Sequence, residues 1–311
     1  MRIAMYGTGG AGGVFGAQLA RAGEEVTFLA RGAHLAAMRE SGLVVERPEG
    51  EIRIERPAVT DDPAAVGGVD LVILGVKTWQ VEEAARAMAP MIGPETAVLP
   101  LQNGVEAAAE LAGALGERHT LVGLCGTISF VVAPGRVRSL GGPNFIRFAE
   151  RGGGTSARAD RILATLRGAG IDAEIPPDID RALWEKFLFV VSAGGMGAAT
   201  RSPVGEVRAH AETRGLLEQA MREIYDVGRA RGVLLSEDAV ARALAFADLL
   251  PADGTSSLQR DLADGRPSEL EAWNGAVGRL GRAAGVATPV HDFIYRILLP
   301  TERRNRGAAR R

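Results

Sequence analysis

Lysine is almost absent from this chain of 311 residues. Of its 36 basic residues only two are lysine, Lys77 and Lys186, and the others are arginine. A guanidinium can replace an ammonium on a solvated surface, but it is effectively always protonated and is therefore a poor acid. The scarcity of lysine raises the question of which role requires an ammonium at these two positions.

The sequence also lacks the features of secreted and membrane proteins. A single cysteine, Cys125, excludes an intrachain disulfide and suits a reducing cytoplasm. Six glycines among residues 7–16 argue against the apolar core of a signal peptide. The longest nearly apolar stretch, 187–199, is too short and too rich in glycine to span a bilayer. We therefore expect a soluble, cytoplasmic protein with no membrane partner.

Neither nucleic-acid binding nor a metal centre is predicted. The net charge of −2 provides no basic field for a polyanion. The four histidines are scattered, and none has a second ligand at metal-binding spacing. Basic residues concentrate only in the C-terminal segment ERRNRGAARR, from Glu302 onward, which we expect to be frayed and solvated.

The two halves of the chain differ in their hydrophobic pattern. The first half alternates strand-like and helix-like segments, and VDLVILGV (69–76) is typical of a strand buried on both faces of a parallel sheet. This pattern predicts an α/β fold with an N-terminal, Rossmann-type doubly wound sheet. Three later segments look like hairpin-connected strands added to that sheet, roughly 121–132, 136–140 and 144–149.

The second half predicts an all-α C-terminal domain. Helical spacing covers 181–200, 205–232, 236–249, 268–284 and 290–299. A turn-rich segment with Pro176 and Pro177 precedes these helices and marks the boundary. We therefore expect domains 1–175 and 176–311, with a shared site in the cleft between them.

A glycine-rich turn follows the first predicted strand. It reads Gly7-Thr8-Gly9-Gly10-Ala11-Gly12, a G-x-G-x-x-G with a strand before it and a helix after it. The first glycine permits the tight turn, the second lets the backbone approach a pyrophosphate, and the third allows helix and strand to pack closely. Because the helix N-terminus then presents unpaired N–H groups to the phosphates, these residues are predicted to bind a dinucleotide.

The end of the second predicted strand indicates which dinucleotide binds. NAD-specific sites place an acidic residue there to accept hydrogen bonds from the ribose. This chain has Ala30 and Arg31 instead, and a guanidinium can pair with a 2′-phosphate. The pattern therefore favours NADP, in its reduced form NADPH, as the cofactor.

Two polar residues follow successive strands of the predicted sheet. Lys77 comes after VDLVILGV, and Asn103 follows the next strand in LPLQNGV. Open α/β sheets bind ligands at the carboxyl ends of their strands. We therefore expect both residues to lie near the nicotinamide, although an Asn-Gly pair is also an ordinary turn.

Five motifs in this order identify a family resemblance: the glycine-rich turn, VKTWQ (76–80), QNG (102–104), LWEKF (183–187) and TSSLQRDLADGRPSELEAWNG (255–275). With them, almost the whole chain resembles the ketopantoate reductases, also called 2-dehydropantoate 2-reductases. The resemblance implies NADPH-dependent reduction of ketopantoate, a small 2-oxo acid, to pantoate, the precursor of pantothenate and coenzyme A.

The resemblance also implies a role for each matching residue. Lys186 falls on the family's catalytic lysine, and Glu269 on the glutamate that helps to bind and orient the substrate. Ser257 matches the serine that holds the substrate carboxylate. Asn103 and Lys77 match positions that line the nicotinamide and substrate region.

The chemistry of ketone reduction agrees with these assignments. Hydride delivery builds negative charge on the ketone oxygen, which must receive a proton or a strong hydrogen bond. The Lys186 ammonium can give up its proton, whereas an arginine could not. The alternative is that Lys186 has no catalytic role and only extends its side chain over apolar neighbours at a helix edge.

The resemblance also assigns Arg31 to the NADPH phosphate.

Two further residues near Glu269 have a structural interpretation. The segment PSELEAWNG looks like the start of a helix, with Ser268 as the N-cap and Glu269 and Glu271 as acids of the first turn. Glu269 can hold both roles, whereas Glu271 is interpreted as purely structural.

One departure from the family leaves the substrate open. Typical members carry asparagines one and two turns after the catalytic lysine, where this chain has Val190 and Gly194. The alternatives are therefore an NADPH-dependent reductase of another 2-oxo acid, or a regulatory protein that binds NADPH without turnover. Apolar helical faces such as 216–227 can pack within the domain or across a homodimer, and the sequence does not choose between them.

Overall fold

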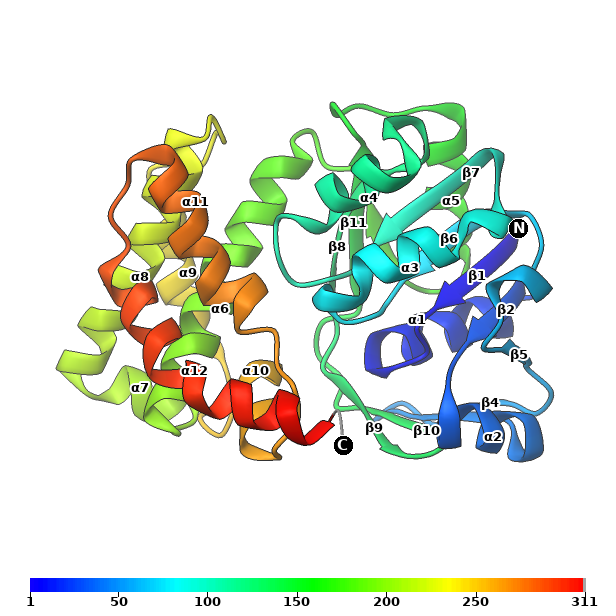
Figure 1. Cartoon of the computed structure of the whole chain (residues 1–311), viewed down its shortest axis with the longest axis horizontal. Helices are drawn as coiled ribbons and strands as arrows, with labels where there is room; N and C mark the ends of the chain where they lie inside the picture. Colours follow the sequence, from blue (N-terminus) through cyan, green and yellow to red (C-terminus); the bar gives the residue numbers. More distant parts are fainter. Residues whose placement is uncertain (310–311) are drawn as a thin grey trace. The chain divides into compact units, whose positions relative to one another are not determined.

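The computed structural model describes residues 1–309 and divides into two compact units (Figure 1). The sheet unit contains Met1–Gln102 and Glu106–Ile179. The helical unit contains everything from Asp180 onward together with the short segment Asn103–Val105. The units thus divide after Ile179, a few residues beyond the expected boundary between 175 and 176, and the chain also enters and leaves the helical unit around the QNG motif.

A five-stranded parallel sheet forms the centre of the sheet unit, as predicted. Its strand order is β5-β2-β1-β6-β7, and every neighbouring pair is parallel. The strands are β1 (Arg2–Tyr6), β2 (Glu25–Leu29), β5 (Ala58–Thr60), β6 (Val69–Leu74) and β7 (Ile92–Pro100). The connecting segments include α1 (Gly10–Arg21), α2 (Gly32–Ser41) and α3 (Val81–Ala87), and α4 (Ala107–Leu115) follows the last strand, β7. The order places the glycine-rich turn, at the end of β1, beside the ends of β2 and β6.

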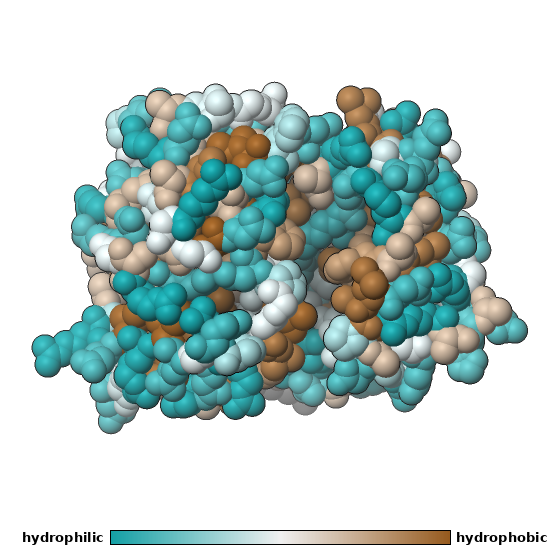
Figure 2. All heavy atoms as spheres, turned by 180° about the vertical axis from the view of Figure 1, so that it is seen from behind, coloured by the Kyte–Doolittle hydropathy of each residue, from teal (hydrophilic) through white to brown (hydrophobic). Residues whose placement is uncertain are grey.

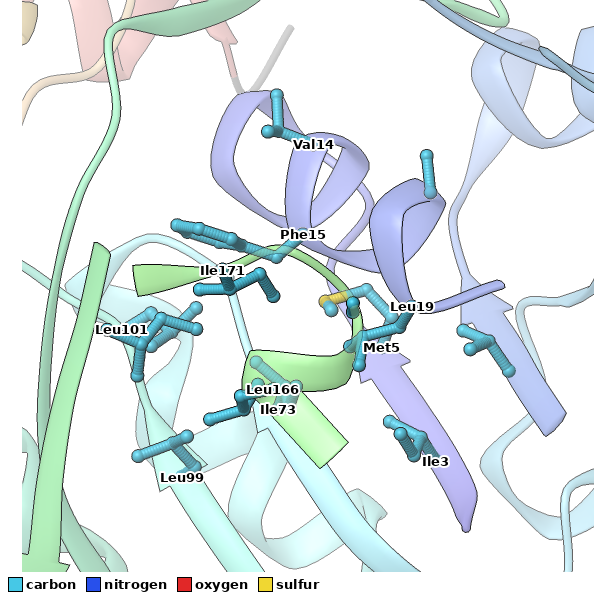
Figure 3. Close-up of a cluster of buried hydrophobic side chains, with 14 of the residues drawn as sticks. Ile3, Met5, Val14, Phe15, Leu19, Ile73, Leu99, Leu101, Leu166 and Ile171 are labelled. Atoms are coloured by element: carbon cyan, nitrogen blue, oxygen red, sulfur yellow. The ribbon is translucent and has the colours of Figure 1, made fainter. Parts of the chain in front are cut away.

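Both faces of this sheet are buried, which explains the continuous apolar runs of its strands. On one face, Ile3 and Met5 of β1 pack with Phe15 and Leu19 of α1 and with residues of α5 (Ala157–Gly168), as Figure 3 shows. On the other face, the alternate residues of β1 and β6 pack against α3 and α4. The alternation of side chains along each strand therefore supplies two separate cores.

The later strands do not extend the parallel sheet, so that expectation was wrong. They form two further sheets, of order β4-β3-β10-β9 and β12-β11-β8. The first contains β3 (Leu43–Glu46), β4 (Ile52–Ile54), β9 (Ser129–Ala133) and β10 (Arg136–Ser139), and the second β8 (Leu121–Gly126), β11 (Phe145–Glu150) and β12 (Asp172–Glu174). Pairings such as β10 with β3 join segments about ninety residues apart, which no local pattern reveals.

The helical unit is all-α within the described residues. Its helices are α6 (Ile179–Thr200), α7 (Val204–Ala209), α8 (Ala211–Ala230), α9 (Ala239–Leu249), α10 (Ser257–Ala263), α11 (Ala276–Ala284) and α12 (Pro289–Ala309). The predicted helix 205–232 is broken at His210, α10 was not predicted, and the predicted helix 268–284 starts only with a π-helical turn at Glu271–Gly275.

The C-terminal segment is a docked helix rather than a frayed tail. Helix α12 continues through Pro300 to Ala309, and the last two residues of the predicted tail lie outside the described part of the chain. Glu302 and Asn305 are buried on the helical unit. The Asn305 amide donates to the carbonyl oxygens of Leu262 and Arg266, at 3.3 and 3.0 Å. The charge composition predicted a solvated tail because it does not show which polar residues are buried. The buried contacts of Glu302 and Asn305 hold this segment on the helical unit instead.

The face of the molecule in Figure 2 is mostly hydrophilic, and its apolar residues lie in small, separate groups. Across residues 1–309, no helix combines the length and the apolar character that crossing a membrane would require.

Candidate active-site residues and the glycine-rich turn

Three glycines of the turn after β1, namely Gly7, Gly10 and Gly12, occupy positions that a larger residue would disturb. Gly7 has a φ of +100°, and a Cβ built on it would lie 2.8 Å from the backbone nitrogen of Val76. A Cβ on Gly12 would overlap the carbonyl oxygen of Gly7 and approach the Met5 sulfur. The start of α1 therefore packs directly on β1 and its turn.

Gly9 differs from its neighbours because it borders open space. It is the N-cap of α1, carries no side-chain cap, and a Cβ built on it would meet nothing within 4 Å. The first turn of α1 therefore has uncapped N–H groups beside an open space, which fits a pyrophosphate. Gly10 instead packs against the Ser129 carbonyl of β9, and Ala11 is half-buried.

The Thr8 side chain is buried and points toward the end of β2. Its hydroxyl and its backbone N–H both donate to the Leu29 carbonyl, at 3.1 and 3.0 Å. These bonds tie the turn to the end of β2. Thr8 can therefore contact a cofactor through its position in the turn, while its hydroxyl holds the turn in place.

Arg31 stands between β2 and α2 with its guanidinium largely exposed. Its Nη2 lies 3.4 Å from the Glu83 carboxylate of α3. Burial raises the pKa of the Tyr6 hydroxyl, and the nearby Arg31 guanidinium opposes that rise. No acidic residue ends β2, so Arg31 could receive a phosphate, but a phosphate would compete there with Glu83.

His34 is a neighbour of the turn that the sequence did not reveal. It lies on α2, and its Nδ1 accepts a hydrogen bond from the Gly135 N–H at 3.0 Å. Burial lowers its pKa, and the nearby Thr8 backbone opposes this less strongly. The His34 ring thus joins α2 to the turn between β9 and β10 at Gly135, through a contact that only the tertiary fold creates.

Lys77 follows β6 and begins a short 3₁₀ turn, Thr78–Gln80. Its backbone N–H donates to the Gln80 side chain at 3.2 Å. The end of β6 is held by Gln102, whose buried amide donates to the carbonyls of Leu74 and Val76, at 3.0 and 2.9 Å. Sequence reasoning chose Asn103 from the QNG motif and missed Gln102, because a crosslink between two strand ends has no local pattern.

Four of the predicted site residues belong to the helical unit: Asn103, Lys186, Ser257 and Glu269. The glycine turn, Arg31 and Lys77 belong to the sheet unit. Lys77 and Asn103 follow adjacent parallel strands, β6 and β7. They nevertheless belong to different units, because the segment Asn103–Val105 is part of the helical unit. The helical unit thus holds Asn103, Lys186, Ser257 and Glu269, whereas the sheet unit holds the predicted phosphate-binding residues together with Lys77, which was also predicted to border the substrate.

Lys186 occupies the half-buried face of α6. The next two residues, Phe187 and Leu188, point into the core of the helical unit, where both are buried. Val190 and Gly194 follow Lys186 at intervals of four residues, so all three lie along one side of the helix. The buried side chains of Phe187 and Leu188 therefore fix the position of α6, and with it the backbone of Lys186.

The segment before the π-helical turn holds Glu269 in a buried position. The π-helical turn begins after Leu270, so Ser268 is not its N-cap, although the Ser268 hydroxyl accepts from the Leu270 N–H at 3.4 Å. The Ser268 N–H and hydroxyl donate to Glu302 of α12, at 3.0 and 2.5 Å to Oε2. Glu271 is exposed and bonds Arg279 and the Tyr295 hydroxyl, in agreement with its structural interpretation. Glu269 and Glu271 thus occupy different environments although they are two residues apart.

Ser257 is the first residue of α10 and is half-buried. The helix is capped by the preceding residue, Ser256, whose hydroxyl accepts from the Gln259 N–H at 3.1 Å. Because Ser256 provides the cap, capping does not engage the Ser257 hydroxyl.

Two family models match consecutive parts of the chain. The model described as Ketopantoate reductase PanE/ApbA matches residues 3–153, and its C-terminal counterpart matches residues 178–302. A 2-dehydropantoate 2-reductase of Halobacterium salinarum is 34% identical over 291 residues, which are 93% of this chain and 95% of that protein.

Solved structures resemble the whole chain. The 2-dehydropantoate 2-reductase from Geobacter metallireducens GS-15 has a TM-score of 0.91 and 29% identity, and covers 96% of this chain and 99% of its own. A D-mandelate dehydrogenase with NADH and anilino(oxo)acetate has a TM-score of 0.91 at 23% identity, over 98% of this chain and 100% of its own. At that identity the second likeness concerns the fold alone.

Proposed function

The chain belongs to the ketopantoate reductase family, and we propose that it reduces 2-dehydropantoate (ketopantoate) to pantoate with NADPH. It is an oxidoreductase that acts on a CH–OH group with a nicotinamide cofactor and a small 2-oxo acid. Production of pantoate would place it in pantothenate and coenzyme A biosynthesis. The observation that carries the proposal is that Asn103, Lys186, Ser257 and Glu269 belong to one compact unit.

The proposed roles follow the chemistry of each side chain. The reduced nicotinamide, when bound, supplies the hydride for the ketone carbon. Lys186 donates its proton to the ketone oxygen, where negative charge develops. Glu269 orients the substrate, and the Ser257 hydroxyl donates to the substrate carboxylate. This division leaves proton transfer to the one residue of the helical unit with a dissociable ammonium.

NADPH is the proposed cofactor because the sheet unit offers two complementary features. The open space beside Gly9 and the uncapped start of α1 fit the pyrophosphate. Arg31 would hold the 2′-phosphate, in a position where NAD-specific proteins have an acid. Lys77 and Asn103 would border the nicotinamide.

Val190 and Gly194 support a second candidate, a related reductase of another 2-oxo acid. Neither residue can supply the side-chain amides that typical family members have at these positions. The same fold is found in a D-mandelate dehydrogenase, so the fold by itself does not select a substrate.

The test is oxidation of NADPH by the purified protein, followed by absorbance, with ketopantoate and with a panel of other 2-oxo acids. We expect ketopantoate to have the highest kcat/KM, and NADPH to be used in preference to NADH. A higher kcat/KM for another 2-oxo acid would replace the substrate assignment with the second candidate. NADPH binding without turnover of any substrate would instead indicate a regulatory protein.

A further inference from the structure

Trp273 is the largest fully buried side chain of the protein's described part, with an exposed fraction of 1%. It lies in the π-helical turn Glu271–Gly275, four residues after Glu269. Trp273 is not one of the predicted site residues. Its contacts nevertheless reach the segments that carry three predicted site residues, Asn103, Lys186 and Glu269.

The first contact joins Trp273 to the QNG segment. The indole Nε1 donates to the main-chain carbonyl of Asn103 at 3.2 Å. A Cβ built on Gly104 would lie 3.7 Å from the carbonyl of Ala272, so this segment runs alongside the turn that contains Trp273. An indole has a single donor and no acceptor, so this bond uses its whole hydrogen-bonding capacity.

The second contact joins Trp273 to the helix of Lys186. A Cβ built on Gly194 would lie only 2.5 Å from Cζ3 of the indole. Gly194 therefore lets the ring approach the α6 backbone two turns beyond Lys186. The same Cβ would lie 3.3 Å from the side chain of Ser256, the cap of the helix that begins at Ser257.

The third contact is with the backbone of Glu269 itself. The Trp273 N–H donates to the Glu269 carbonyl at 3.0 Å, and the Gly275 N–H donates to Leu270 at 3.0 Å across five residues. Such π-helical turns insert an extra residue into a helix and often occur at functional sites. Here the turn directs the indole toward Gly194 and Asn103.

We propose that Trp273 is a positioning residue that sets the spacing of Asn103, Lys186 and Glu269. The indole N–H fixes the main chain at Asn103, and the ring packs on α6 at Gly194, where the side chain of Ser256, the cap of α10, also approaches the helix. The effect on catalysis rests on the proposed function, whereas the attachment of Asn103 does not. Gly194 is therefore glycine because the indole occupies the space of its side chain, rather than to enlarge a substrate pocket.

The test compares Trp273→Phe with Trp184→Phe. Trp184 is also buried in the helical unit, packs edge-on against Phe187 with ring centroids 5.8 Å apart, and provides a matched loss of indole. We expect Trp273→Phe to lower kcat about tenfold with KM for the 2-oxo acid little changed, since misplaced groups weaken the transition state more than the ground state. Trp184→Phe should reduce thermal stability to a similar extent and leave kcat near that of the parent protein.

Hydrogen exchange provides a readout that does not require turnover. We expect faster amide exchange at residues 103–105 in Trp273→Phe, and unchanged exchange there in Trp184→Phe. If the parent protein fails to reduce ketopantoate, the proposed function is wrong, while this exchange measurement still decides the role of Trp273. Unchanged exchange at 103–105 would overturn the proposal, as would equal effects of both substitutions on kcat.

A second variant covers the case in which Trp273→Phe does not fold. Gly194→Ala keeps the indole and introduces the Cβ that would overlap it. We expect the displaced ring to lower kcat and to increase exchange at residues 103–105. Parent values of both quantities in Gly194→Ala would also overturn the proposal.

Discussion

Glu302, near the end of the last helix, accepts hydrogen bonds from both the main chain and the hydroxyl of Ser268, the residue that precedes Glu269. The Glu302 carboxylate also pairs with Arg306, whose guanidinium donates to the Ser268 carbonyl at 2.8 Å. With an exposed fraction of 4%, Glu302 is shielded from water. The C-terminal helix therefore holds the segment that presents Glu269.

Glu302→Ala should destabilise the protein by about 2–4 kcal/mol, because it leaves two donors of Ser268 buried without their acceptor. The free energy of unfolding in urea measures this loss. Glu271→Ala is the matched control: Glu271 is exposed and pairs with Arg279, so its loss should cost about 0.5 kcal/mol or less. Similar losses in the two variants would contradict the anchoring role of Glu302.

Lys186→Ala should lower turnover by roughly two orders of magnitude or more, the usual contribution of a general acid. Lys186→Arg should be almost as slow, because a guanidinium does not release its proton. Both variants should bind NADPH like the parent protein in a fluorescence titration, which separates loss of chemistry from loss of the cofactor. Near-normal turnover in either variant would remove Lys186 from proton transfer.

Arg31→Ala should weaken NADPH binding by about tenfold, in line with the loss of a charge-assisted hydrogen bond, and leave NADH binding almost unchanged. Dissociation constants for both cofactors provide the measurement. Equal losses for NADPH and NADH would refute the assignment of Arg31 to the 2′-phosphate.

Glu83→Gln should have the opposite effect on the same site. Its carboxylate pairs with Arg31 at the exposed surface, where it would compete with a phosphate. Removing the charge should strengthen NADPH binding by a few-fold at low salt, and the gain should shrink as salt screens the charges. NADH binding is the internal control, and weaker NADPH binding would argue against the competition.

The protein should lose stability below neutral pH through His291. Its ring is fully buried between the Asn274 amide and the Ala220 carbonyl, each at 2.9 Å, and burial lowers its pKa to about 4 from the usual 6.5. Between these two values the unfolded chain takes up a proton that the folded chain excludes. The free energy of unfolding should therefore fall as the pH drops from 6.5 to 4, by up to about 3 kcal/mol.

The control for this prediction is His291→Gln, measured over the same pH range. Burial raises the pKa of the neighbouring Glu223, whose contribution runs the other way and is lost as the pH rises. Because Glu223 is present in both proteins, the difference between parent and variant isolates His291. A difference that does not change with pH would show that His291 does not cause the acid sensitivity.

The parallel sheet, the glycine turn and the change to an all-α second half could all be predicted from local patterns. Gly7, Gly9 and Gly12 follow a strand and precede a helix. In the structure each is glycine for a different reason: Gly7 for its positive φ, Gly9 for the open space beside it, and Gly12 for its close packing on the Gly7 carbonyl. The strands β8 to β11 were expected, but the sheets that they join, and the helix α10, could not be predicted in this way. Their pairing and burial depend on partners far along the chain, such as β3 for β10.

The chemical groups that this protein carries can be read from its sequence: two lysines among many arginines, a glycine-rich helix start, and motifs in a family order. How these groups are held in place depends on the tertiary fold. Gln102 crosslinks strand ends, Glu302 anchors Ser268, and Trp273 joins Asn103 to Gly194. The physical reason is that local patterns report backbone preference and burial, whereas a buried hydrogen bond or a close ring contact depends on where distant segments meet.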